Sequence, residues 1–324
     1  MGGGAGVTEI ILNSGHKMPV MGMGTASYPY PDPETVESAV LEAISLGYRH
    51  FDTASAYRTE RPLGRAISTA IQNGLINGRD DVFVTTKLWC GDADRDLVVP
   101  ALKESLRALG MEYVDLYLIH FPGRVKKSEG ENGLIFSKED ILQFDMRGTW
   151  EGMEECHRLG LARSIGVSNF SCKKLQLLLS HAVIPPAVNQ VEMHPIWQQR
   201  KLRKLCSELG IHVSAYSPLG AGGALWGSTM VLESIEIKHI AEAKGKTPAQ
   251  VCLRWAFEQG VSFLPKSFNK GRLKENMEIF DWKLDDEDLE KLNHIPQQRI
   301  TIAEIHVSPN GPYQSIEDIW DGEL

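Results

Sequence analysis

The stretch GYRHFDTASAY, residues 47–57, opens with a glycine that ends a helical pattern, and a short apolar strand then leads to Asp52 and Tyr57. Two later segments have the same form. Lys87 and His120 each stand where an apolar strand gives way to a loop. Four ionisable groups at the corresponding ends of three successive strands predict one common site.

The helix before this stretch has clear limits in the sequence. Asp32 is a good N-cap, Pro33 suits the first helical position, and apolar residues continue at helical spacing until Gly47. A capping-box signature at Thr247 marks the start of a later helix. The same change, from a helical pattern to a glycine and then to a short apolar run, recurs at Gly110, Gly160, Gly210 and Gly260.

Eight short apolar segments are expected as strands: 20–24, 48–52, 82–87, 114–120, 164–168, 187–192, 212–217 and 262–265. They are rich in Val and Ile and alternate with helices of roughly 10–15 residues, which indicates parallel strands covered on both faces. This repetition has no break in composition. It favours an α/β fold with one domain, residues 1–324, as a single (β/α)8 TIM barrel. Two doubly wound halves or an open sheet are the alternatives.

An N-terminal hairpin and three long segments lie outside the regular alternation of strands and helices. Residues 8–18 are expected to form a β-hairpin that plugs the N-terminal end of the barrel. Residues 122–145, residues 218–230 and a C-terminal tail over residues 296–324 are long connections, and long connections are usually functional or disordered. We expect them to wall a substrate pocket at the C-terminal face. The alternative is that they are surface insertions that contact no ligand.

Composition restricts the class of partner. The chain has 324 residues, 42% hydrophobic and 23% charged, with a formal net charge of -8, which is typical of a soluble globular protein. That charge argues against a general nucleic-acid binder and leaves a small molecule as the expected partner. The five cysteines are scattered without a C-x-x-C pair, which predicts a reducing compartment and no structural zinc site. No signal peptide or membrane-spanning run of about 20 apolar residues is visible, so we predict a cytoplasmic location without a membrane partner.

Polar residues follow most of the expected strands. A single histidine or aspartate in such a place is more often structural than catalytic. In a barrel, however, all of these residues would converge on the C-terminal face, where active sites are built. They are Asp52, Lys87, His120, Ser168, Asn169, Gln190, Tyr216, Ser217, Lys266 and Ser267.

Seven motifs, in this order, resemble those of the aldo-keto reductase superfamily and its plant branch. They cover nearly the whole chain: GMGT (22–25), GYRHFDTA (47–54), TKLW (86–89), IH (119–120), IGVSNF (165–170), NQ (189–190) and PKS (265–267). The resemblance implies NADPH-dependent reduction of an aldehyde or ketone, here a carbonyl compound of plant specialised metabolism. It also implies a monomer.

The resemblance assigns a role to each of the four ionisable groups. Tyr57 would be the general acid that protonates the carbonyl oxygen. Lys87 would lower the Tyr57 pKa, and Asp52 would keep Lys87 charged and oriented. His120 would position and polarise the carbonyl group. No metal is expected in the site.

The resemblance also implies the cofactor contacts. GMGTAS, residues 22–27, lacks the third glycine of a Rossmann fingerprint, so that fold is rejected. Two cations near a helix start, Lys266 and Arg272, suit the 2'-phosphate of NADPH. Gly24, Thr25 and Asp52 also belong to the implied site. The nicotinamide contacts are Ser168, Asn169, Gln190 and Tyr216, the pyrophosphate contacts Ser217, Leu219 and Gly220, and the remaining contacts Lys266, Ser267, Phe268, Asn269, Arg272, Glu275 and Asn276.

The chain departs from the family pattern beside the substrate. Phe121-Pro122 stands where many members have Trp-Pro, and Arg58 follows the catalytic tyrosine where a small residue is common. Trp89, Phe121 and Trp226 are the candidates for an apolar pocket wall. Two other functions stay open: a nicotinamide-binding regulatory barrel with little turnover, and a lyase or isomerase that uses Lys87 as a Schiff base.

Overall fold

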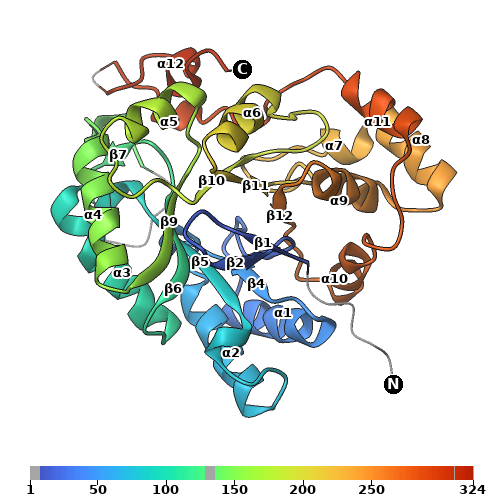
Figure 1. Cartoon of the computed structure of the whole chain (residues 1–324), viewed down its shortest axis with the longest axis horizontal. Helices are drawn as coiled ribbons and strands as arrows, with labels where there is room; N and C mark the ends of the chain where they lie inside the picture. Colours follow the sequence, from blue (N-terminus) through green and yellow to red (C-terminus); the bar gives the residue numbers. More distant parts are fainter. Residues whose placement is uncertain (1–7, 128–135, 310, 324) are drawn as a thin grey trace.

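Parallel strands arranged in a ring form the centre of the molecule (Figure 1). The computed structural model describes residues 8–127, 136–309 and 311–323. Within these residues eight strands pair in chain order, and each lies in one of the predicted segments or overlaps it. They are β3 (Met23–Gly24), β4 (His50–Asp52), β5 (Phe83–Leu88), β6 (Val114–Ile119), β9 (Ala162–Ser168), β10 (Val188–Glu192), β11 (His212–Tyr216) and β12 (Ser262–Leu264).

The first and last strands of the ring meet, so the sheet is a closed barrel and the open-sheet alternative is wrong. Met21 forms a parallel bridge with Phe263, and the Gly22 amide donates to the Phe263 carbonyl at 3.0 Å. A Cβ on Gly22 would lie 2.6 Å from Leu264 Cδ2 and 2.9 Å from His50 Cγ. Only glycine therefore allows the backbone to approach closely enough to close the ring. The fold is the predicted (β/α)8 TIM barrel.

Helices surround the barrel and connect its strands (Figure 1). The predicted limits of the first helix are confirmed. Asp32 accepts a hydrogen bond from the Thr35 amide at 2.8 Å, and Gly47 ends the helix at φ +102°. The described helices are α1 (Pro33–Leu46), α2 (Glu60–Gln72), α3 (Arg95–Leu109), α4 (Met146–Arg158), α5 (Cys172–Leu179), α6 (Arg200–Glu208), α7 (Met230–Glu233), α8 (Ile235–Lys244), α9 (Pro248–Glu258), α10 (Lys270–Met277), α11 (Asp286–Asn293) and α12 (Ile316–Trp320).

The predicted hairpin closes the N-terminal end of the barrel. Strands β1 (Glu9–Ile11) and β2 (Lys17–Pro19) pair antiparallel. Met18 is fully buried and belongs to one apolar cluster with Phe83 and Val188, the first residues of β5 and β10. The Asn13 side chain donates to the Pro186 carbonyl at 3.0 Å. These contacts confirm the plug, because all of them involve the N-terminal ends of barrel strands.

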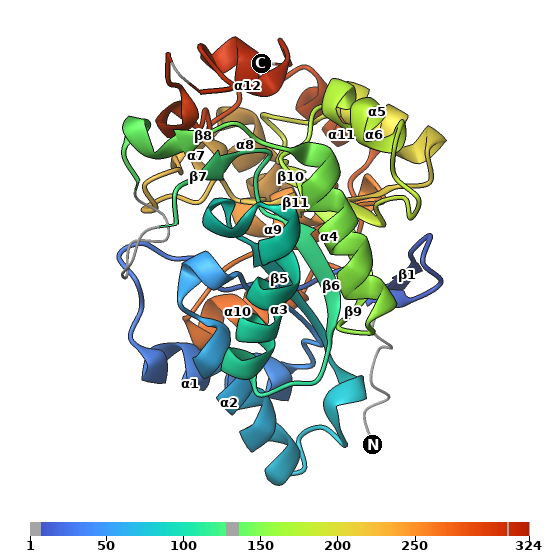
Figure 2. The same ribbon diagram turned by 90° about the vertical axis from the view of Figure 1, so that its left-hand side faces the viewer.

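The C-terminal tail packs against the long connection that follows β6. That connection contains the short ribbon of β7 (Arg124–Val125) and β8 (Ile141–Leu142), and residues 128–135 of the predicted loop lie outside the described residues. Figure 2 shows this ribbon and α12 at the same end of the molecule. Side chains of both segments share one buried apolar cluster with Phe121.

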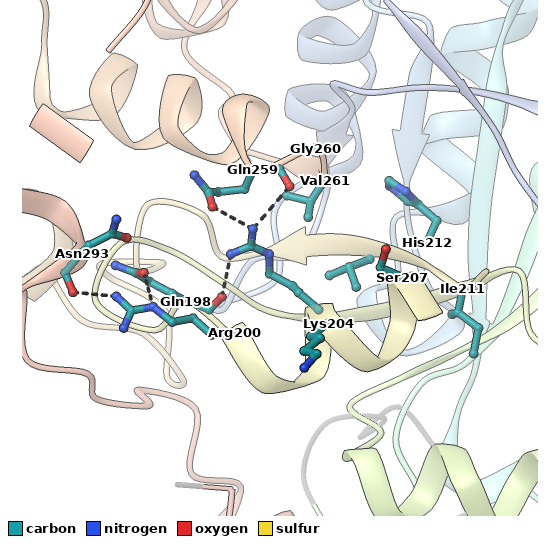
Figure 3. A pocket seen from close by; sticks show the side chains of 12 residues that line it. Gln198, Arg200, Lys204, Ser207, Ile211, His212, Gln259, Gly260, Val261 and Asn293 are labelled. Carbon is teal, nitrogen blue, oxygen red and sulfur yellow. Dashed lines mark hydrogen bonds between the residues drawn. The ribbon is translucent and has the colours of Figure 1, made fainter. Parts of the chain in front are cut away.

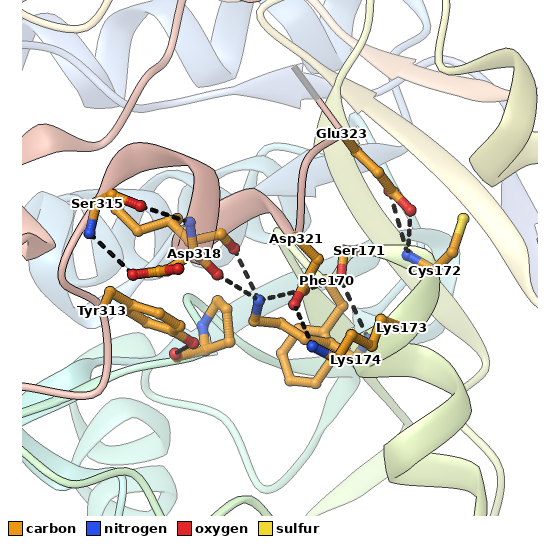
Figure 4. A network of polar contacts seen from close by, with 12 residues as sticks. Phe170, Ser171, Cys172, Lys173, Lys174, Tyr313, Ser315, Asp318, Asp321 and Glu323 are labelled. Carbon is orange, nitrogen blue, oxygen red and sulfur yellow. Dashed lines mark hydrogen bonds and ion pairs between the residues drawn. The ribbon is translucent and has the colours of Figure 1, made fainter.

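Ionic contacts attach the end of the tail to α5 (Figure 4). Lys174 Nζ lies 2.5 Å from Asp321 Oδ2 and donates to the Ile319 carbonyl at 2.7 Å. The Glu323 carboxylate accepts a hydrogen bond from the Cys172 amide at 3.2 Å, at the first residue of α5. Carboxylates are favourable there because a helix N-terminus carries partial positive charge.

Candidate active site

A buried ion pair forms the base of the site. Lys87, at the end of β5, is fully buried, and its Nζ lies 2.5 Å from Asp52 Oδ1 and 2.9 Å from the Thr53 carbonyl oxygen. The second carboxylate oxygen of Asp52 accepts a hydrogen bond from Gln190 Nε2 at 2.8 Å. Burial lowers the pKa of Lys87, and the attraction of Asp52 opposes that shift. Strands β4, β5 and β10 thus bring three predicted residues together.

Tyr57 and His120 meet above this pair. Tyr57 lies on the 3-10 turn Ser55–Tyr57, and its hydroxyl is 3.0 Å from His120 Nε2. Lys87 Nζ is 4.9 Å from the centre of the Tyr57 ring. Burial, helped by Lys87 and His306, lowers the pKa of His120 well below its usual range, so this imidazole is neutral at neutral pH.

Lys87 does not bring the Tyr57 pKa below its usual value in this geometry, so the expected net lowering is wrong. Burial raises the pKa of Tyr57 well above its usual value, and the Asp52 carboxylate raises it further. The reason is that the Lys87 ammonium points to Asp52 and to the Thr53 carbonyl, whereas the phenolic oxygen is hydrogen-bonded to His120. Tyr57 therefore keeps its proton at neutral pH, which is the state that a proton donor requires.

A network of amide and hydroxyl groups lies beside the four ionisable residues. Asn169 follows β9 in the left-handed conformation, at φ +65°, and its side chain donates to the His120 carbonyl at 3.0 Å and accepts from the Tyr216 hydroxyl at 2.8 Å. Ser168 Oγ donates to the Gln190 carbonyl at 2.8 Å. The structure brings these predicted residues together at the ends of β9, β10 and β11.

Gly24 ends β3 and Thr25 follows it, at the same end of the barrel. The Thr25 side chain is fully buried and donates to the Asp52 carbonyl at 3.0 Å, so it supports the backbone that carries the ion pair. A Cβ on Gly24 would lie 3.2 Å from the Leu264 carbonyl oxygen. Both residues are therefore close to the site, but the observed contacts of Thr25 are internal.

The connection after β11 carries three more predicted residues. Ser217 and Gly220 have positive φ angles of 48° and 82°. A Cβ on Gly220 would come within 2.6 Å of the Ser228 carbonyl oxygen. Leu219 packs half-buried against the main core. The loop thus folds back tightly on itself beside Tyr216.

A cationic cluster forms where β12 leads to α10. Lys266 and Arg272 are both exposed to solvent, but partial desolvation and the charge of Arg272 lower the pKa of Lys266. Lys266 Nζ lies 5.1 Å from the centre of the Phe268 ring. Asn269 caps α10 by accepting from the Arg272 amide at 3.0 Å, and its own amide donates to Ser267 Oγ at 3.1 Å. Two neighbouring cations at a helix start can hold a phosphate.

The last two predicted cofactor residues have structural contacts. Glu275 Oε1 accepts a hydrogen bond from Thr247 Oγ1 at 2.7 Å, which ties α10 to the start of α9. Asn276 is buried on the same helix as Leu273, whose carbonyl accepts a hydrogen bond from the Tyr48 phenol at 3.0 Å. The structure thus places both residues on α10, which is held by neighbouring elements.

The three aromatic candidates have different surroundings. Trp89 is half-buried and lies edge-on to His120, with ring centres 5.1 Å apart. Trp226 is also half-buried, and its carbonyl is 3.4 Å from Thr301 Oγ1 in the tail. Phe121 is only 6% exposed and stacks on the His306 ring at 3.8 Å. The structure therefore places Phe121 in the contact that holds the tail.

Two residues beside the site were not among the sequence candidates. Glu192, at the end of β10, accepts from the Ile300 and Thr301 amides, each at 2.8 Å, and so attaches the start of the tail to the barrel. A carboxylate in a buried strand needs hydrogen-bond donors, and this requirement could have identified Glu192 from the sequence. His306 had no signal, because its position depends on how the tail folds.

In residues 8–127, 136–309 and 311–323, no group of three or more His, Cys, Asp or Glu side chains could hold a metal ion. No helix in the same part of the chain is long and apolar enough to cross a membrane.

Similarity to known proteins agrees with this geometry. Residues 20–296 match the model of the aldo/keto reductase family. Deoxymugineic acid synthase 1 of Oryza sativa subsp. japonica is 54% identical over 322 residues, covering 99% of each chain. Rhazimal reductase 2 of Alstonia scholaris is 52% identical over 317 residues, covering 98% of each.

Solved structures show the same likeness. The Bombyx mori aldo-keto reductase in complex with NADP is 38% identical with a TM-score of 0.83, covering 94% of this chain and 99% of that one. The aldose reductase of Schistosoma japonicum is 32% identical with a TM-score of 0.84, covering 95% and 99%. The chain therefore belongs to the aldo/keto reductase family of NADPH-dependent oxidoreductases.

Proposed function

We propose that this protein reduces an apolar aldehyde or ketone of plant specialised metabolism to the alcohol, with Tyr57 as the proton donor. The observation that carries the proposal is the 3.0 Å contact of the Tyr57 hydroxyl with His120 Nε2, beside the buried pair of Lys87 and Asp52. The similar proteins named above that come from plants include a reductase and a synthase. The half-buried Trp89 beside His120 suits an apolar substrate.

The residues present fit NADPH. Amide and hydroxyl groups of Ser168, Asn169 and Gln190 lie at the ends of neighbouring strands and can hold a carboxamide. The Lys266 and Arg272 cations repel each other, and a phosphate between them would relieve that repulsion. Bound NADPH would supply the hydride for the carbonyl carbon.

The protein's own groups would handle the proton. His120 Nδ1 is buried without a hydrogen-bond partner in the described structure, whereas Nε2 faces the Tyr57 oxygen. A buried N–H without an acceptor is rare in proteins, so we place the imidazole proton on Nε2. The Tyr57 proton then stays available for the substrate oxygen, which would lie within hydrogen-bond reach of both the Tyr57 hydroxyl and His120 Nε2.

Lys87 and Asp52 would stabilise the Tyr57 phenolate that proton transfer leaves behind. Donation of the Tyr57 proton leaves a phenolate, and the Lys87 ammonium lies 4.9 Å from its ring. The Asp52 carboxylate favours the charged form of Lys87. A charge that is already oriented in a buried site stabilises the developing anion without reorganisation.

The test replaces Tyr57 with phenylalanine. We expect Tyr57→Phe to lower turnover of a generic aromatic aldehyde by about 10²–10⁴-fold, since the proton donor is lost. NADPH binding, followed by protein fluorescence, should be unchanged. Tyr113→Phe is the control, because that phenol bonds Asp80 next to the N-terminal end of β6. Equal loss of turnover and of NADPH affinity in the Tyr57 variant would refute the assignment.

The other functions considered from the sequence are not favoured. A regulatory barrel would not need Asp52, Tyr57, Lys87 and His120 in mutual contact. A Schiff base would require Lys87 to leave a buried ion pair. A cytoplasmic location, a monomeric state and the organisation of residues 1–324 as one domain stay predictions.

A further inference from the structure

A cavity apart from the site described above lies where the chain enters β11 and β12, at the ends of these strands away from Tyr57. It has a volume of about 580 Å³. One wall is a face of α6, which contributes Arg200, Arg203, Lys204 and Ser207 at helical spacing (Figure 3). The floor is the chain that enters β11 and β12. Because the catalytic residues lie where the strands end, this cavity is separate from the nicotinamide site.

The cavity is lined by positively charged side chains and by no carboxylates. Arg200, Arg203 and Lys204 line the cavity, and none of its lining residues is an aspartate or a glutamate. The described part of the chain places no carboxylate in an ion pair with any of these three cations. The whole protein carries a formal net charge of -8, so this local excess of positive charge runs against the average. A concave surface with charges of one sign attracts ligands of the opposite sign.

Neutral groups hold the two guanidinium groups in place (Figure 3). Arg200 Nη2 donates to the Asn293 carbonyl at 2.6 Å, and Arg203 Nη2 donates to Gln259 Oε1 at 2.7 Å. Gln198 accepts from both arginines. Carbonyl groups at the ends of α9 and α11 explain why the arginines point inward. After these contacts, Arg200 Nη1 and Arg203 Nε have no hydrogen bond to the described residues. Burial and the charge of Arg200 both lower the pKa of Arg203.

The floor of the cavity is apolar. Ile211, Val213 and Val261 are each at most 5% exposed and line the side that faces the barrel. An organic group could make van der Waals contacts with these side chains, which a bare inorganic ion cannot do. The volume lies in the range of ordinary small-molecule pockets, roughly 300–1,000 Å³.

We propose that this cavity binds a small phosphorylated organic molecule, with the phosphate between Arg200, Arg203 and Lys204 and the organic part over Ile211, Val213 and Val261. Guanidinium groups match phosphate geometry and bind it through two parallel hydrogen bonds. Lys204 adds a third charge from the next position of the helix. The site is distinct from the cationic cluster at Lys266 and Arg272, which lies beyond the other end of β12.

The experiment uses phenyl phosphate as the probe and keeps the nicotinamide site filled. The protein is saturated with NADPH, and binding of the probe is measured by isothermal titration calorimetry at low salt. We expect Arg200→Gln and Lys204→Gln each to raise the Kd about 10-fold, since each variant removes one positive charge that would contact the phosphate. Lys204 makes no side-chain hydrogen bond in the described structure, so its variant keeps the fold. Turnover of an aldehyde should be unchanged in both.

Matched probes and a control variant complete the test. Lys238→Gln, at an exposed position of α8 outside the cavity, should leave the Kd unchanged. Phenol, which lacks the phosphate, should not compete. Three results would overturn the proposal: no binding of phenyl phosphate to the NADPH-loaded protein, equal affinity in the parent and both variants, or inorganic phosphate binding as tightly as phenyl phosphate.

Discussion

Lys87 shows why the chemistry of a single residue depends on its surroundings. A lysine ammonium with no solvent contact is costly unless it is paired, and here Asp52 and the Thr53 carbonyl provide partners. The sequence predicted the pair, because both residues end strands of the expected barrel. It did not predict the direction of the Tyr57 pKa, since that depends on how much water the folded chain removes from the phenol.

A single substitution at Arg272 tests the preference for NADPH over NADH. Arg272→Ala should raise the Kd for NADPH by roughly 10–100-fold and leave the Kd for NADH nearly unchanged, because only NADPH carries the 2'-phosphate. Fluorescence titration with both cofactors measures this. Lys270→Ala is the control, since that lysine pairs with Glu42 on α1. A preference for NADPH that stays intact in the Arg272 variant would contradict the role.

Among the elements, α2 and α3 approach each other unusually closely. A Cβ on Gly64 of α2 would lie 2.0 Å from the Leu109 carbonyl oxygen at the end of α3. No such contact occurs between real atoms, so the backbones would have to separate. A helical pattern alone would favour alanine over glycine at this position by about 1 kcal/mol. Packing between helices therefore decides the residue.

Gly64→Ala tests this packing. We expect a lower urea midpoint, equivalent to a net loss of about 1–3 kcal/mol, because the added methyl group overpacks the contact. Gly78→Ala is the matched control in the loop that follows α2. Gly78 has an extended backbone and no atom within 4 Å of the added Cβ, so its variant should be neutral. If both variants unfold at the parent's midpoint, the close approach does not exist in solution.

In the molecule as a whole, the C-terminal tail packs against the middle of the chain. Lys174, 8% exposed at its side chain, bonds Asp321 and the Ile319 carbonyl, and so attaches the tail to α5 (Figure 4). Glu192 holds the other end of the tail at β10. Between these points His306 stacks on Phe121, which follows the predicted site residue His120 in the chain. The tail therefore lies beside the site that we propose for the substrate.

Lys174→Met should release this contact without unfolding the barrel. Removing one partner of a buried ion pair costs about 3 kcal/mol, so limited proteolysis of the tail should speed up by roughly 100-fold. The KM for a ketone should rise more than turnover falls. Lys173→Met is the control, because Lys173 also pairs with Asp321 but is 80% exposed. Cleavage at equal rates in the two variants would show that Lys174 does not hold the tail.

The sequence by itself determined the order of the strands, the limits of the first helix, the hairpin and the motif residues at the strand ends. These features are local, because a cap, a glycine or a run of apolar residues acts within a few positions of itself. Asp52, Lys87 and His120 could be placed together because parallel strands of a barrel all end at one face.

Only the tertiary structure decided the contacts between segments that are distant in the chain. The stacking of Phe121 on His306, the attachment of the tail at Glu192 and Lys174, and the cationic cavity beside α6 all join residues with no common sequence pattern. Such contacts depend on the packing of whole elements. The protonation state of Tyr57 was decided in the same way, since desolvation in the folded chain and the nearby Asp52 carboxylate raise the pKa of its phenol.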